Sequence, residues 1–237
     1  MAYERKEESI PLQEFYAISL EENEIAFIYF GFAGILLRSQ EQVVALDLGK
    51  LCLKDEEFKD LEQLDVQLYS HTHWDHWDLD LTKRIFEATG AKIVAEPEIA
   101  KEMAEQVPAD SLTSAMPDAI LQINGFQISP VIGVHPRPIT LFRVEWGDFS
   151  IFHGADSGPV PLENVPADIA FIPTGTPSPT CSPQNALKMA RDLNSKIVVA
   201  MHGTKTQVEK FKKLMAKKMP ATVVLSPKIG ELVRINL

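Results

Sequence analysis

The N-terminal part of the chain alternates apolar runs with short polar clusters. Four such runs lie at residues 15–20, 24–31, 34–39 and 43–49, and a fifth follows at residues 65–70. They are rich in β-branched and aromatic side chains, and polar turns separate them. This pattern predicts strands joined by tight turns.

Helical periodicity begins only after this region. Residues 80–90 place apolar side chains three or four positions apart and end at Gly90, a residue that readily closes a helix. A strand is predicted at residues 91–96. A helix follows at residues 97–107, with Pro97 in its first turn.

The second half of the chain repeats this order. Asn124-Gly125 and Gly147-Asp148 each separate two apolar runs and predict hairpins. Ser182 and Pro183 are typical of a helix start. The remaining predicted elements are strands at 167–175, 196–203, 221–226 and 230–237 and helices at 182–195 and 207–219. The pattern indicates an α+β fold of two mixed sheets flanked by helices.

Neither a repeat nor a low-complexity linker divides the chain, so we expect one domain over residues 1–237, with residues 1–24 as an N-terminal extension. The longest uncharged apolar run has 13 residues (25–37), fewer than the ~20 needed to span a bilayer. No secretory signal is visible, and Cys52 and Cys181 lie far apart. These features predict a cytoplasmic protein without a membrane span.

The net charge of −10 argues against sequence-independent binding of nucleic acid, which relies on clustered cationic side chains. A small-molecule substrate is the expected partner, and assembly into a homo-oligomer is left open.

Candidate chemistry is concentrated at residues 71–76, which hold three of the six histidines. His71 and His73 are two positions apart on an extended segment, so their side chains project to the same side and can reach one cation. Asp75 and His76 lie beyond the turn and could reach a second. Imidazole and carboxylate ligands without thiolate suit zinc, iron or manganese. The alternative is an exposed polar loop.

Four other predicted strands also end in a metal-capable residue. These residues are Asp47, His135, Asp156 and His202. A single histidine after a buried strand is more often structural. Four such endings beside the histidine cluster favour a metal site, because ligand sites gather where strands end at one edge of a sheet.

The segment Ser-His-Thr-His-Trp-Asp-His, residues 70–76, resembles the His-x-His-x-Asp-His motif of the metallo-β-lactamase fold superfamily. Asp47, this motif, His135, Asp156 and His202 also follow the order of that superfamily's five motifs. Residues 70–85 and 171–204 are similar to the metal-dependent hydrolase branch that includes ascorbate-6-phosphate lactonase and N-acylphosphatidylethanolamine phospholipase D. The resemblance implies a four-layer αββα sandwich that binds two divalent metal ions, foremost Zn²⁺, with Mn²⁺ or Fe²⁺ as alternatives.

Transferred to this chain, the resemblance implies a complete set of metal ligands. One ion would be held by His71, His73 and His135, the second by Asp75, His76 and His202, and Asp156 would bridge them. Asp47 would lie behind the site and orient a ligand, and His153 would be structural. Two departures bear on the substrate: Phe32 stands where this branch often carries histidine, and no proline follows Asp47.

A protein with such a site would be a metal-dependent hydrolase, in which two metal ions generate a hydroxide nucleophile from bound water. The expected substrate is a small anionic ester, lactone or phosphoester, with Asp75 or Asp156 passing a proton to the leaving group. Trp74, Trp77, Arg137 and Lys205 are candidate substrate contacts. The alternative for the tryptophans is core packing, and for Arg137 and Lys205 a solvated surface. Cys181 is expected to pack rather than bind metal.

Three other functions compete with this prediction. Relatives that reduce oxygen or nitric oxide at a di-iron site carry a glutamate at the position of His73 and an added flavin domain. Nucleases of this fold add an RNA-binding arm or an inserted domain. A catalytically silent metal-binding or sensing module would be expected to lose at least one ligand, whereas this chain keeps the full set.

Overall fold

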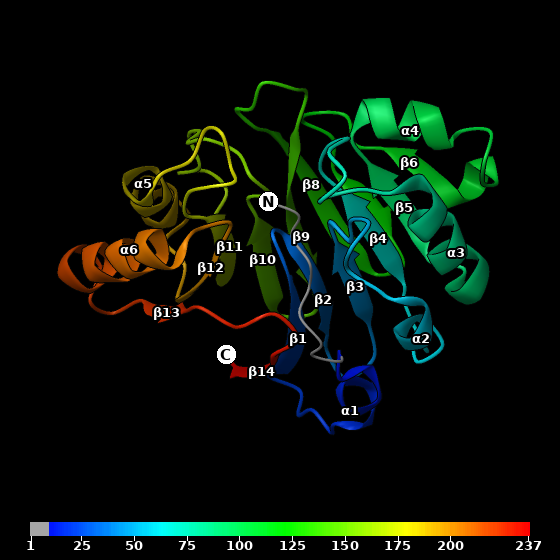
Figure 1. Cartoon of the computed structure of the whole chain (residues 1–237), viewed down its shortest axis with the longest axis horizontal. Helices are drawn as coiled ribbons and strands as arrows, with labels where there is room; N and C mark the ends of the chain where they lie inside the picture. Colours follow the sequence, from blue (N-terminus) through cyan, green and yellow to red (C-terminus); the bar gives the residue numbers. More distant parts are fainter. Residues whose placement is uncertain (1–9) are drawn as a thin grey trace.

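The computed structural model describes residues 10–237 and shows two β-sheets packed face to face (Figure 1). The first has the strand order β14-β1-β2-β3-β4-β5-β6 and the second β13-β12-β11-β10-β9-β8-β7. The first sheet comprises β1 (Glu24–Gly31), β2 (Gly34–Arg38), β3 (Val43–Leu46), β4 (Val66–Tyr69), β5 (Lys92–Ala95), β6 (Leu112–Ser114) and β14 (Leu232–Asn236). The second comprises β7 (Leu121–Ile123), β8 (Phe126–Ile132), β9 (Thr140–Trp146), β10 (Phe149–His153), β11 (Ile169–Pro173), β12 (Ile197–Met201) and β13 (Val223–Leu225).

Helices cover the outer face of each sheet. They are α1 (Leu12–Ala17), α2 (Asp55–Phe58), α3 (Leu79–Thr89), α4 (Pro97–Met103), α5 (Pro183–Leu193) and α6 (Lys205–Lys218), with a short 3₁₀ turn at Ala109–Ser111. Buried residues of α1, α3 and α4 pack on the first sheet, and those of α5 and α6 pack on the second. The predicted four-layer αββα sandwich is therefore confirmed.

The side chains of strand β1 alternate between the core between the two sheets and the core beneath the helices. Because successive side chains of a strand point to opposite faces, Phe27 lies between the two sheets, where its ring meets that of Phe171 at 5.3 Å. Its neighbour Ile28 points outward and packs with Phe15 of α1. Strand β1 is buried on both faces, so its apolar run is nearly continuous.

The parallel strands bring distant parts of the chain to one edge. Strands β3 to β6 run parallel to one another, as do β10 to β13. Strand β8 is antiparallel to β9, which is antiparallel to β10, so β8 runs in the same direction as β10. The segments that follow these strands carry the histidines and aspartates singled out in the sequence.

The structure corrects some of the predicted elements. The strand predicted at residues 15–20 is wrong, because Phe15–Ala17 belongs to helix α1. Leu12 and Phe15, three positions apart and both buried, form the inward face of this helix after Pro11. Helix α4 ends at Met103, earlier than predicted, and α2 and β6 were not predicted.

The structure describes residues 10–24 of the expected N-terminal extension. Residues 1–9 lie outside the described residues. Residues 10–23 include α1, and the backbone N–H of Ile10 donates to Glu57 Oε1 at 3.0 Å. Among the described residues, no helix combines the length and the apolar character needed to cross a membrane.

Candidate metal centre

Seven histidine and aspartate side chains meet at the edge of the sandwich where β4, β8, β10 and β12 end. Each lies on the segment that follows one of these strands, as the sequence predicts. They fall into two groups, and within each group one candidate ligand atom per residue lies within 4.8 Å of the others. The first group is His71, His73, His135 and Asp156, and the second is Asp75, His76 and His202.

Asp156 lies between the two groups. One carboxylate oxygen, Oδ1, is 3.6 Å from His71 Nε2. The other, Oδ2, is 3.6 Å from His135 Nε2 and 3.9 Å from His76 Nε2. One carboxylate therefore faces histidines of both groups.

The second group is tightly packed. His202 Nε2 is 3.1 Å from His76 Nε2, and Asp75 Oδ2 is 3.7 Å from His76 Nε2. The two imidazole rings are stacked, with an interplanar angle of 8°. The two nitrogens and the carboxylate oxygen are therefore close enough together to hold one cation.

Several of these buried polar atoms lack a hydrogen-bond partner among the described residues. They include His71 Nε2, His135 Nε2 and Asp156 Oδ1. Burying such groups without partners costs free energy. A divalent cation would satisfy all three atoms at once, so the donor set fits a metal site.

Asp47 supports the second group from behind, at the position that the resemblance implies. Its Oδ2 is 2.7 Å from His76 Nδ1 and accepts a hydrogen bond from Ser70 Oγ at 2.6 Å. Its Oδ1 accepts from the backbone N–H of Ser70 at 2.7 Å. A carboxylate on Nδ1 favours the tautomer that leaves Nε2 free to bind a metal.

The electrostatics of the centre follow from its burial. Burial lowers the pKa of His71, His76 and His202 well below the usual range, and neighbouring histidines lower it further. These imidazoles are neutral at pH 7, as metal ligation requires. Burial also raises the pKa of Asp156 to about 7, and the nearby carboxylates of Asp75 and Asp47 add to this rise.

Backbone strain is concentrated around the centre. Seven described non-glycine residues have a positive φ, and four of them lie here: Phe32 at 50°, Asp47 at 47°, Ala155 at 47° and His202 at 38°. Such conformations are unfavourable for residues with a Cβ and persist only where surrounding contacts hold them. Their clustering is typical of a functional site.

The four candidate substrate contacts occupy different environments. Trp74 is 51% exposed beside the second group. Trp77 is buried among Tyr69 and Ile99, which favours the packing alternative. Arg137 is exposed, and its backbone N–H donates to His135 Nδ1 at 3.2 Å. Lys205 lines a groove along α6 with Lys210 and Lys213, and none of the seven side chains lines this groove.

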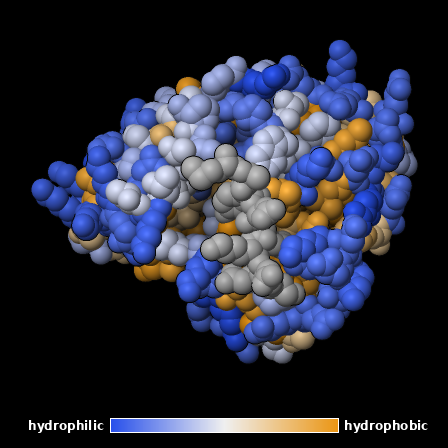
Figure 2. Space-filling view, viewed as in Figure 1, coloured by the Kyte–Doolittle hydropathy of each residue, from blue (hydrophilic) through white to orange (hydrophobic). Residues whose placement is uncertain are grey.

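The remaining polar candidates pack as expected. His153 Nε2 is 2.9 Å from the carbonyl oxygen of Ala33, and the residue belongs to neither group. The Cys181 thiol donates to the Pro173 carbonyl at 2.8 Å. The lysines of α6 form a solvated surface over buried Phe211 and Met215, and this part of the surface is hydrophilic in Figure 2.

Sequence reasoning missed Ser70 and the role of Phe32. Ser70 links Asp47 to His71, because its hydroxyl also lies 3.0 Å from His71 Nδ1. Its position directly before the first histidine was the available signal. Phe32 lies over His202, with ring centroids 5.7 Å apart, a contact between residues far apart in the sequence.

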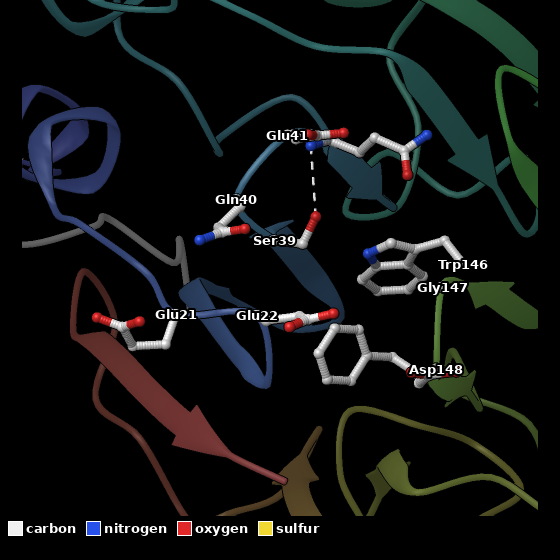
Figure 3. A pocket seen from close by; sticks show the side chains of 10 residues that line it. Glu21, Glu22, Ser39, Gln40, Glu41, Trp146, Gly147 and Asp148 are labelled. Carbon is white, nitrogen blue, oxygen red and sulfur yellow. Dashed lines mark hydrogen bonds between the residues drawn. The ribbon is translucent and has the colours of Figure 1, made fainter.

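A separate hollow of about 490 Å³ lies at the opposite edge, between the β2–β3 and β9–β10 turns (Figure 3). Trp146 and Phe149 form its apolar wall, and exposed Glu22, Glu41 and Asp148 surround it. It contains no histidine and none of the seven side chains of the centre. Among the described residues, both groups of possible metal ligands lie at the other edge.

Comparison with known proteins shows the family. The family described as the beta-lactamase superfamily domain matches residues 26–202, so the chain belongs to this family. Comparison with curated proteins gave no match.

Three solved structures illustrate the shared fold. Igni18, a metallo hydrolase from Ignicoccus hospitalis, is 19% identical, with a TM-score of 0.76 over 90% of this chain and 99% of that chain. The metallo-beta-lactamase fold protein YhfI from Bacillus subtilis is 16% identical, with a TM-score of 0.71 over 90% and 100%. CmlA, a diiron beta-hydroxylase from Streptomyces venezuelae, is 13% identical, with a TM-score of 0.71 over 93% and 55%.

Proposed function

We propose that this protein is a metal-dependent hydrolase that uses two divalent metal ions on a small anionic ester, lactone or phosphoester. The position of Asp156 between the two groups carries this proposal. The descriptions of Igni18 as a metallo hydrolase and YhfI as a metallo-beta-lactamase fold protein support it. The similarity of residues 70–85 to the lactonase and phospholipase D branch favours substrates with a phosphate or ester group.

The proposed ligands follow the two groups. His71, His73 and His135 would hold one ion, Asp75, His76 and His202 the other, and Asp156 both. Zinc is the expected metal, with manganese or iron as alternatives. When bound, the pair would lower the pKa of water toward neutrality and polarise the oxygen of the scissile group.

The chain's own residues would orient the substrate and move protons. Asp75 is the better placed proton carrier, because its side chain is 12% exposed and burial raises its pKa. Asp156 is more enclosed, at 4%. Arg137, beside His135, would attract the anionic part of the substrate.

The test combines metal content with turnover. Zinc-loaded protein would be assayed with p-nitrophenyl acetate, a γ-lactone and bis-p-nitrophenyl phosphate, beside Asp75→Asn. We expect hydrolysis of at least one substrate. In Asp75→Asn we expect the rate per bound zinc ion to fall by about 100-fold or more, with zinc content measured because Asp75 is also a proposed ligand. Zinc-loaded protein that hydrolyses none of them would favour the silent binding or sensing module instead.

A further inference from the structure

The edge of the metal centre carries an aromatic pair whose arrangement points to part of the substrate. Phe32, on the β1–β2 turn, and Trp74, within the histidine cluster, meet in a T-shaped contact with centroids 5.5 Å apart and an angle of 78°. Phe32 also lies against the His202 ring at 5.7 Å. The pair therefore adjoins the second group directly.

The backbone of Phe32 has an unfavourable conformation that hydrogen bonds hold in place. Its φ of 50° lies in the left-handed region, which is unfavourable for a bulky side chain. Its carbonyl oxygen accepts hydrogen bonds from the Tyr29 hydroxyl at 3.0 Å and from the backbone N–H of His202 at 3.3 Å. These bonds fix the turn, so the ring is directed at the metal centre at a conformational cost.

Trp74 is equally fixed at its backbone, although its ring is exposed. Its carbonyl accepts from the backbone N–H of Lys50 at 2.9 Å. The two loops approach so closely that a Cβ on Gly49 would lie 2.4 Å from the Asp75 carbonyl carbon. Even so, the Trp74 side chain remains 51% exposed, a large apolar surface left uncovered beside the reacting groups.

The first group has a cationic neighbour instead. Exposed Arg137 lies two residues after His135, its backbone N–H donates to His135 Nδ1, and no ion pair is present for its side chain among the described residues. The first group thus has an arginine next to it in the chain, and the second has an aromatic pair. A substrate with an anionic part and an apolar part would match both features.

We propose that Phe32 and Trp74 form a subsite for an aryl or short alkyl group of the substrate, next to the bond that is cleaved. This inference rests on the proposed hydrolase function and narrows its substrate class to esters or phosphoesters with an apolar substituent. Trp74 supplies the exposed contact surface. Phe32 is a positioning residue: its ring contacts the Trp74 ring on one side and the His202 ring on the other.

The experiment measures binding, without turnover, of two non-hydrolysable anions to the zinc-loaded protein by calorimetry. Methylphosphonate and phenylphosphonate present the same anionic group but differ in the apolar part. We expect phenylphosphonate to bind about tenfold more tightly to the wild type. In Trp74→Ala and Phe32→Ala the ratio should fall to about two or less, whereas Trp74→Phe should retain most of it.

Zinc content is measured on every variant, so that lost metal is not mistaken for a lost subsite. Val223→Ala is the matched control, because Val223 is 53% exposed and pairs with Ile197 at the start of β12, the end away from His202. Trp74 is exposed, so its alanine variant should fold even if Phe32→Ala does not.

Equal binding of the two phosphonates, or a ratio that survives Trp74→Ala, would overturn the subsite while leaving the hydrolase proposal intact. Zinc-loaded protein that binds neither phosphonate would overturn both proposals.

Discussion

The two groups at the metal centre differ in exposure and in support. In the second group His76 and His202 are buried, and the Asp47 carboxylate contacts His76 Nδ1 at 2.7 Å. In the first group His73 is partly exposed, and a backbone N–H rather than a carboxylate meets His135 Nδ1. We therefore expect the second group to bind its ion more tightly than the first. Water and substrate would reach the first group beside His73.

Replacing the residue common to both groups should have the largest effect. Because Asp156 faces both groups, we expect Asp156→Asn to lose most of the bound metal and to lower hydrolysis by about 1,000-fold or more. Elemental analysis after dialysis measures the first effect and an ester assay the second. Asp148→Asn, at the far edge, is the matched control. Metal content unchanged in Asp156→Asn would show that this carboxylate is not shared.

Single replacements within each group should separate the two sites. We expect His73→Ala and His202→Ala each to lose about one of two zinc ions, because each removes one of three or four ligands from a single group. The ion that remains should bind more tightly in His73→Ala, which keeps the supported second group. A competition titration with a zinc chelator measures this difference. Equal affinity in the two variants would contradict the comparison.

The Asp47 carboxylate, which contacts His76 Nδ1, should account for part of the difference in zinc affinity between the two groups. Asparagine tolerates the positive φ at position 47 and keeps an acceptor for the Ser70 N–H, so Asp47→Asn should fold. We expect it to weaken the second ion by about 10–100-fold and to leave the first nearly unchanged. The same chelator titration applies. A loss shared equally by both ions would mean that Asp47 acts on the whole centre.

The smallest expected effect is that of pH on metal affinity. In the metal-free protein the pKa of Asp156 is raised to about 7, so below pH 7 a cation must displace its proton. Affinity should therefore rise with pH, by at most about tenfold per pH unit, and level off above pH 7 to 8. The buried histidines add no slope there, because their lowered pKa keeps them neutral. Zinc titrations between pH 5.5 and 8.5 measure this, and affinity that falls with pH would contradict it.

Much of this centre could be predicted because its determinants are local in sequence. The spacing of His71, His73 and His76 and the polar residues at the strand ends are visible in the chain. The parallel strands then bring these residues to one edge. The hairpins at Asn124-Gly125 and Gly147-Asp148 were likewise predicted from turn chemistry and are confirmed.

The remaining features depend on tertiary contacts. Trp74 and Trp77 are three positions apart, yet one is exposed and the other buried, because only Trp77 faces β5 and α4. The contact of Phe32 with His202 joins the β1–β2 turn to the end of β12. The sequence of helix α1 also predicts a strand, because its apolar run is too short to distinguish helical from strand periodicity. Packing of Leu12 and Phe15 on the first sheet stabilises the helix.

The most direct test of the two-group centre is the metal content of the wild-type protein. It would be purified without added metal, loaded with zinc, dialysed and measured by elemental analysis. From the two groups of possible ligands we expect about two ions per chain, and the ion in the second group should be retained at a lower free zinc concentration than the ion in the first. A single ion per chain, or none after loading, would contradict a centre in which Asp156 joins two metal sites.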